Sequence, residues 1–150
     1  MKYLITLSFV WMAFLSIALD KDKLYKEYPI AADHKSMCEY WLKEFAASKN
    51  ENALNLAYYG AFQTIMANHL KNPFDKLETF KKGKANIEAA VQKDPSNIEI
   101  RFIRYSIQRK APGFLNYNSK LSTDKKFLLE YKHKVESKTL LWLIDNIIKD

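Results

Sequence analysis

The stretch ALNLAYYGAFQTIMANHLKNPFDKLETFKKGKANIEAAVQKDPSN, residues 53–97, decides the fold of this chain. Its apolar side chains recur three and four positions apart, which is the repeat of one face of an α-helix. Asn72-Pro73 ends the first helix and begins the next, because proline is favoured in a first helical turn and blocks continuation of the preceding helix. Asp94-Pro95 marks the end of the second. The stretch therefore predicts a hairpin of two helices, over residues 53–70 and 74–93.

Two glycines lie within this hairpin, although glycine costs a helix about 1 kcal/mol relative to alanine. Gly60 is the only glycine of the first helix, and we expect another helix to cross closely at that point, since glycine has no side chain. Gly83 interrupts the second helix, so we expect the middle of that helix to be its weakest point.

Helical periodicity continues on both sides of the hairpin. Residues 98–109 carry apolar side chains on most of their surface, so we expect this helix at the centre of the domain. Three Gly and four Pro are too few for a turn-rich sandwich or barrel. We therefore predict an all-α fold of about five to six helices in one small domain. The other expected helical segments are residues 31–48 with Asp33 as a cap, 122–135 with Ser122 or Thr123 as a cap, and 139–148.

Two segments outside the hairpin carry more apolar side chains than a loop or a surface helix usually does. Residues 111–117 contain Pro112 and Gly113 and cannot form a regular helix, yet they carry two aromatic side chains and a leucine. We expect them to form an ordered loop packed onto the helices. Residues 139–148 are apolar nearly all round, so this helix is expected to bury its whole surface or to meet a partner.

The amino terminus has the pattern of a secretory signal. Met1-Lys2 supplies a basic start, residues 3–17 form an apolar run, and the chain turns polar at residues 20–23. As a helix the run would measure roughly 22 Å, which is shorter than the roughly 30 Å hydrocarbon core of a bilayer. We therefore expect a cleaved signal and no transmembrane span once it is removed.

The cleavage site follows from side-chain size. Ser16 and Ala18 place small residues three positions and one position before a cut between Ala18 and Leu19. No cysteine follows the cut, so the attachment pattern of bacterial lipoproteins is missing. We predict a signal peptide over residues 1–18, a single helical domain over residues 19–150, and a periplasmic or secreted location.

The charge and the single cysteine limit the partners and the chemistry. The chain carries a net charge of +7, of which the charge of Lys2 leaves with the signal. Lysines are scattered among Glu and Asp, which favours a solvated surface over a nucleic-acid site.

Cys38 has no second cysteine to pair with, so no internal disulfide forms. We expect Cys38 to be a small buried hydrophobe, with intermolecular pairing or a reactive thiol as the alternatives.

Patterns typical of enzymes and metal sites are missing from the sequence. The three histidines fall on different segments, and neither HExxH nor paired cysteines occur. There is no Gly-x-Ser-x-Gly elbow and no glycine-rich phosphate loop. His34 and Cys38 are four positions apart on an expected helix, but no third group orients them. We predict a protein that is not an enzyme and holds neither metal nor cofactor.

Two arginines and several aromatic residues are the candidates for a binding surface. Arg101 and Arg104 share a helix face at i,i+3 spacing and could together bind a carboxylate, a peptide terminus or a phosphate. Alternatively, each pairs with an acidic side chain of an adjacent helix. Tyr58 and Tyr105 could line a groove beside them, or belong to the core. Our leading hypothesis is a groove for a protein or peptide; the alternative is a basic surface that contacts envelope polymers or anionic lipid.

Two resemblances support this interpretation. Residues 90–97, with Ala90 five positions before Pro95, resemble the close of a tetratricopeptide repeat, and Tyr59-Gly60 resembles a step in the first helix of that repeat. This resemblance implies helix-hairpin packing and protein binding. The stretch AYYGA…NPFDKLETFKKG…DPSNIEIRFIRYSIQ…APGFLNY…DKKF looks like small exported proteins of Bacteroidetes bacteria, which implies origin and compartment.

Overall fold

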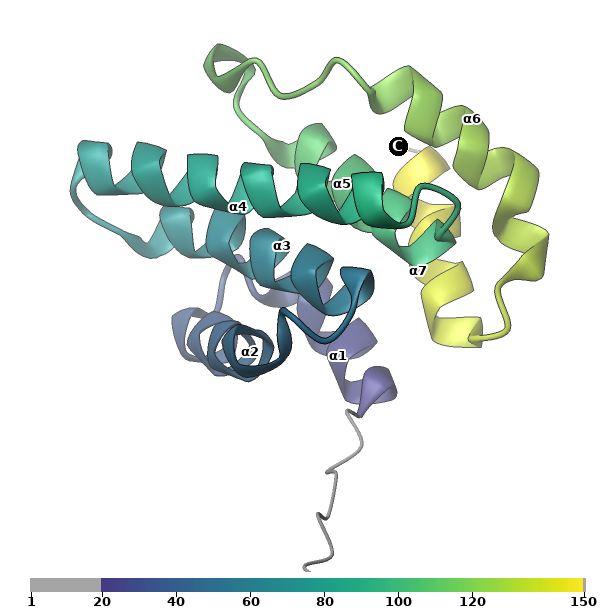
Figure 1. Cartoon of the computed structure of the whole chain (residues 1–150), viewed down its shortest axis with the longest axis horizontal. Helices are drawn as coiled ribbons and strands as arrows, with labels where there is room; N and C mark the ends of the chain where they lie inside the picture. The colour runs from purple at the N-terminus through teal and green to yellow at the C-terminus, as the bar shows by residue number, and fades with distance from the viewer. Residues whose placement is uncertain (1–19, 150) are drawn as a thin grey trace, which may run out of the picture.

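Figure 1 shows the computed structural model of the chain, which describes residues 20–149. Within that range the chain is helical and forms no strand, so the predicted all-α class is confirmed. The predicted signal peptide and its cut between Ala18 and Leu19 lie outside the described residues. The elements are α1 Lys21–Glu27, η1 Tyr28–Ile30, α2 Lys35–Ser48, α3 Ala53–His69, α4 Pro73–Lys93, α5 Ile98–Lys110, η2 Gly113–Leu115, α6 Leu121–Tyr131, η3 Lys132–Lys134 and α7 Lys138–Lys149, where η denotes a short 3-10 helix.

The predicted count of five to six helices was too low, because residues 20–149 contain seven α-helices. The additional helix is α1. Its start is capped by Asp20, whose side chain accepts a hydrogen bond from the backbone N–H of Lys23 at 3.0 Å. Only Leu24 and Tyr25 are buried in this seven-residue helix, which is too short to display a periodic apolar face.

Asparagine side chains cap three of the longer helices, each by accepting a backbone N–H of the first turn. These caps are Asn52 for α3, Asn72 for α4 and Asn97 for α5.

The predicted caps of α2 and α6 were wrong. The backbone N–H of Asp33 closes a turn with the carbonyl of Ile30, and α2 begins two residues after Asp33. Helix α6 begins at Leu121, so Ser122 and Thr123 lie within the helix and do not cap it. The side chain of Gln108 accepts the backbone N–H of Lys120, directly before the helix.

Helices α3 and α4 form the hairpin that the sequence predicts, and they pack side by side along their length (Figure 1). A side chain added at Gly60 would place its Cβ 2.6 Å from the carbonyl oxygen of Gly83. A Cβ added at Gly83 would lie 2.5 Å from the carbonyl oxygen of Gly60. The expectation of a close helix crossing at Gly60 is therefore confirmed, and Gly83 is the residue that faces it.

An aromatic cluster holds α2 and η1 against α3. The rings of Phe45 and Tyr58 stack with their centroids 5.0 Å apart, and Phe45 and Phe62 stack at 5.9 Å. Tyr28 meets both Tyr58 and Phe62 edge to face at 5.7 Å. Trp41 stacks on Phe62 and donates its indole N–H to Glu27 at 2.7 Å. Because η1 is held by these contacts, its outer side forms a fixed wall of the groove described below.

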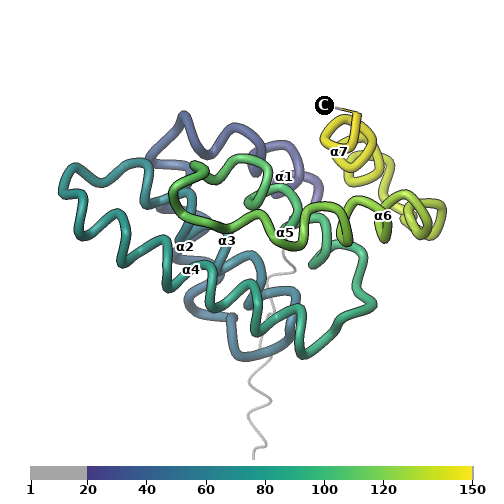
Figure 2. The backbone as a smooth tube through the Cα atoms, turned by 90° about the horizontal axis from the view of Figure 1, so that it is seen from above, coloured from purple at the N-terminus to yellow at the C-terminus, as the bar shows by residue number. Residues whose placement is uncertain are grey.

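Helix α5 lies at the centre of the molecule, as the sequence predicts. Most of its residues are buried, and it contacts α3, α4, α6 and α7. In Figure 2, α6 and α7 form one end of the molecule, with α5 between them and the hairpin of α3 and α4.

Helix α7 buries Leu140, Leu143 and Ile144 but leaves Trp142 63% exposed, so its surface is only partly covered. Among residues 20–149, no helix combines the length and the apolar character needed to cross a membrane.

Candidate functional site

The two predicted tyrosines of the binding site lie in the core. Tyr58 is 1% exposed and Tyr105 is 2% exposed. Tyr58 donates its hydroxyl hydrogen to Glu99 at 2.7 Å, and burial together with the Glu99 carboxylate raises the Tyr58 pKa well above its ordinary value. Tyr58 therefore links α3 to the first turn of α5 and presents no free polar group to a ligand.

The two predicted arginines are held by carboxylates of neighbouring helices. Arg101 Nε donates to Asp124 at 2.6 Å, while Arg104 binds Asp124 through Nε and Nη2, each at 2.7 Å. Arg104 Nη1 also donates to Glu88 at 3.0 Å, and Glu88 accepts the hydroxyl of Tyr117. These contacts match the alternative in which each arginine pairs with an acidic side chain of another helix.

This network fastens α6 and α4 to α5. Asp124 is fully buried, and its two oxygens accept three hydrogen bonds from the two arginines. A buried carboxylate is stable only when it is paired and hydrogen-bonded, and both conditions hold here. The arginines thus hold the helices together, and neither they nor the two tyrosines line the main opening of the molecule.

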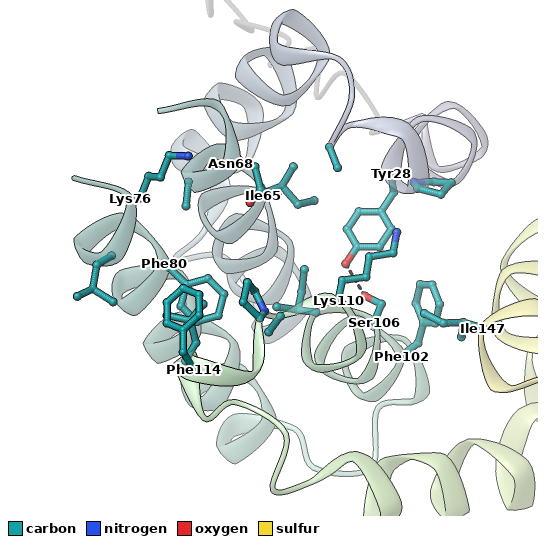
Figure 3. Close-up of a pocket in the computed structure, with 18 of the residues that line it drawn as sticks. Tyr28, Ile65, Asn68, Lys76, Phe80, Phe102, Ser106, Lys110, Phe114 and Ile147 are labelled. Atoms are coloured by element: carbon teal, nitrogen blue, oxygen red, sulfur yellow. Dashed lines mark hydrogen bonds between the residues drawn. The ribbon is translucent and has the colours of Figure 1, made fainter. Parts of the chain in front are cut away.

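The main opening is an apolar groove with a volume of about 720 Å³, which we call the α3–α7 groove. It lies where the α3–α4 turn, the end of α5 and the loop after α5 meet η1 and α7 (Figure 3). Its lining is mostly apolar. The lining residues are Tyr28, Pro29, Ala32, Ile65, Ala67, Asn68, Pro73, Phe74, Lys76, Leu77, Phe80, Phe102, Ser106, Ile107, Lys110, Ala111, Pro112, Phe114, Leu115, Trp142, Leu143, Asn146 and Ile147.

Exposed hydrophobic side chains gather at this groove. Phe74 is 83% exposed and Phe114 is 84% exposed, and Trp142 and Leu77 are exposed as well. These four account for most of the large exposed hydrophobic residues among residues 20–149, the others being Ile30, Tyr40 and Leu129. Apolar patches of this kind on a protein surface mark sites for ligands or partners.

Local sequence explains why these side chains stay outside the core. Phe74 follows Pro73 in the first turn of α4, ahead of the part of that helix that faces α3. Phe114 lies in η2, where Pro112 ends the helical conformation and Asn116 adopts a left-handed backbone with φ of 48°. The loop was expected to pack onto the helices, and Tyr117 does so, whereas Phe114 points away from the core.

Polar groups in the groove are few. Tyr28 and Ser106 share a hydrogen bond of 2.7 Å between their hydroxyls and so satisfy each other. Figure 3 shows Lys110 extending beside Tyr28, with Lys76 on the other side of the groove. No carboxylate, histidine or cysteine is among the lining residues that the structure describes.

Groups that could serve as a nucleophile or hold a metal lie elsewhere. Cys38 is fully buried, its thiol lies 3.5 Å from the carbonyl oxygen of Phe62, and burial raises its pKa to about 12. The burial expected for Cys38 is confirmed, and His34, on an exposed position, does not bond to it. Within residues 20–149, no three His, Cys, Asp or Glu side chains converge as metal ligands would.

Comparison with known proteins adds no assignment, because no family model, curated protein or solved structure matches this chain. The site is therefore defined by its own geometry. The sequence places Phe74 at the start of a predicted helix, Phe114 in a predicted loop and Trp142 in an apolar helix, but only the packing of distant segments brings the three to one groove.

Proposed function

We propose that the protein is an exported, non-enzymatic binding protein and that the α3–α7 groove is its binding site. The gathering of Phe74, Phe114, Trp142 and Leu77 around one concave surface carries this proposal. Leaving large apolar side chains in water has a free-energy cost that a ligand removes when it covers them. Clefts of roughly 300–1,000 Å³ with mainly apolar walls are typical of ligand sites, and the volume of this groove lies within that range.

The lining favours binding over catalysis. General acid–base chemistry uses groups such as His, Glu or Asp at the reacting atoms, and the described lining contains none of them. The hydroxyls of Tyr28 and Ser106 are committed to each other. Apart from its lysines, the groove therefore offers shape and apolar contact rather than reactive groups.

The hairpin of α3 and α4, which resembles a tetratricopeptide hairpin, supplies one wall of the groove through Ile65 and Phe80. In this proposal the ligand presents an apolar chain or face, as a protein or peptide segment does when it enters a helical groove. The second candidate is contact with anionic lipid at an envelope surface, and the exposed Trp142 on α7 favours it.

Binding of an environment-sensitive apolar dye tests the proposal. Phe114→Ala should weaken dye binding by about tenfold, because burying roughly half of a phenylalanine side chain contributes about 1–2 kcal/mol. Leu129→Ala is the matched control, since Leu129 is an exposed hydrophobic residue that does not line the groove. Equal effects of the two substitutions, or no saturable binding, would contradict the assignment of the groove.

A further inference from the structure

The charged side chains that line the α3–α7 groove are all positive. Lys76 and Lys110 are its only charged lining residues, and both are exposed. Neither lysine forms an ion pair within residues 20–149, although other surface lysines such as Lys26 and Lys82 pair with a carboxylate four positions away. An anionic group on a ligand would therefore meet an ammonium group on either side of the groove and no opposing carboxylate in the lining.

The remaining walls match a hydrocarbon chain better than an extended peptide. An extended peptide brings a backbone donor and acceptor at each residue, and buried groups of this kind need partners. Few lining side chains have polar groups to offer, and those of Tyr28 and Ser106 already bond to each other. A hydrocarbon chain needs no such partners, and the side chains of Ile65, Phe80 and Phe114 offer it contact.

One polar group beside the groove lacks a partner. Asn146 on α7 lines the groove, and its side-chain amide nitrogen is buried without a hydrogen-bond acceptor among the described residues. Buried donors of this kind are uncommon in folded proteins. A ligand with acceptor oxygens would add an acceptor on this side of the groove.

We propose that the ligand of the groove is a single-chain anionic amphiphile, namely a long-chain carboxylate whose hydrocarbon lies in the groove and whose carboxylate pairs with a lysine at one side of it, Lys110 or Lys76. This inference rests on the proposed binding function and specifies its ligand. The ammonium group of that lysine holds the carboxylate at the solvent side, while the aromatic lining removes the chain from water.

Equilibrium binding of hexadecanoate and of its neutral counterpart hexadecan-1-ol to the full chain tests this inference. The double variant Lys76→Met/Lys110→Met removes both charges and keeps unbranched apolar side chains. Lys43→Met/Lys126→Met is the matched control, because it changes the net charge equally at exposed lysines outside the groove.

We expect the groove variant to weaken hexadecanoate binding by about fivefold, as loss of a partly screened charge contact implies, and to leave hexadecan-1-ol binding unchanged. The control should bind both ligands as the unaltered chain does. Each methylene removed from the carboxylate chain should weaken binding by about fourfold, since each buried methylene contributes a similar factor.

The outcomes separate this inference from the function on which it rests. If hexadecan-1-ol binds as tightly as hexadecanoate, or if both double variants respond alike, the carboxylate assignment is wrong while the apolar groove stands. If the dye binds but neither amphiphile does, the occupant is of another class, such as a partner helix, and the inference is overturned. If no apolar probe binds, the proposed function itself fails.

Discussion

Replacing Gly60 or Gly83 by alanine should destabilise the protein, although alanine is the better helix former. Each residue lies in the interior of a long helix, where alanine would gain about 1 kcal/mol from helix propensity alone. The structure predicts the opposite sign. The added Cβ at Gly60 would lie 2.6 Å from the carbonyl oxygen of Gly83 and 2.9 Å from the backbone nitrogen of Ile87.

The size of the effect follows from which atoms would have to move. At Gly83 the new Cβ would lie 2.5 Å from the carbonyl oxygen of Gly60 and 2.8 Å from the backbone nitrogen of Thr64. Backbone atoms cannot rotate away, so α3 and α4 must separate, and overpacking of this kind costs about 1–3 kcal/mol or more. Because the clash involves backbone atoms of both helices, we take the upper end of this range, about 3 kcal/mol, and after the gain in propensity expect a net loss of about 2 kcal/mol in the free energy of unfolding.

Denaturant unfolding followed by circular dichroism measures this loss, with thermal unfolding as a second readout. The melting temperature should fall by roughly 5–10 °C for a domain of this size. Gly113→Ala is the control, because an added Cβ there meets no atom within 4 Å, and it should be neutral or slightly stabilising. A Gly60→Ala or Gly83→Ala protein as stable as the unaltered chain would refute the close crossing.

Three further predictions address the ion-pair network, the buried tyrosines and the amino terminus. Asp124→Ala should cost about 3–5 kcal/mol of stability, because Arg101 and Arg104 lose the buried carboxylate that holds them, whereas Asp33→Ala at an exposed position should change little. An Asp124→Ala protein of unchanged stability would show that the network is dispensable. Burial raises the pKa of Tyr28 and of Tyr58 above the ordinary value of 10.0, so both stay protonated in the folded chain after the unfolded chain has ionised. Their contribution to stability is therefore complete below about pH 10 and declines above it, by about 1.4 kcal/mol per pH unit for each tyrosine. Tyrosinate absorbance of these two residues should appear only together with loss of helix, and its appearance in a fully helical protein would contradict their burial. Mass spectrometry of the exported protein should find Leu19 as the first residue, whereas an intact Met1 in the membrane fraction would overturn the predicted cleavage.

The helices that the sequence predicts correctly are those with strong local signals. Asn72-Pro73 and Asp94-Pro95 divide the hairpin where the structure does, and Gly60 marks the close crossing. Helix α1 has no strong local signal, because its seven residues bury only two side chains and the polar residues 20–23 also fit the end of a signal peptide. Local pattern identifies an element only when the element is long enough to repeat.

The candidate site was harder to predict because it depends on contacts between distant segments. Arg101 and Arg104 look available on a helix face, but Asp124, twenty and more residues away, accepts hydrogen bonds from both. Phe74 begins a predicted helix and Phe114 lies in a predicted loop, yet the fold places both around one groove. A useful signal was available in the large aromatic side chains that directly follow Pro73 and Pro112-Gly113, since turns seldom need such residues for their own conformation.

The fluorescence of Trp142 tests the binding groove most directly. Trp142 lines the groove at 63% exposure, whereas Trp41 is buried in the aromatic cluster, so the difference between the unaltered chain and Trp142→Phe isolates the signal of the groove. During titration with hexadecanoate, we predict a saturable blue shift of that difference emission at one ligand per chain, because the bound chain removes water from the indole. An unchanged Trp142 emission at saturating ligand would contradict the groove as the binding site.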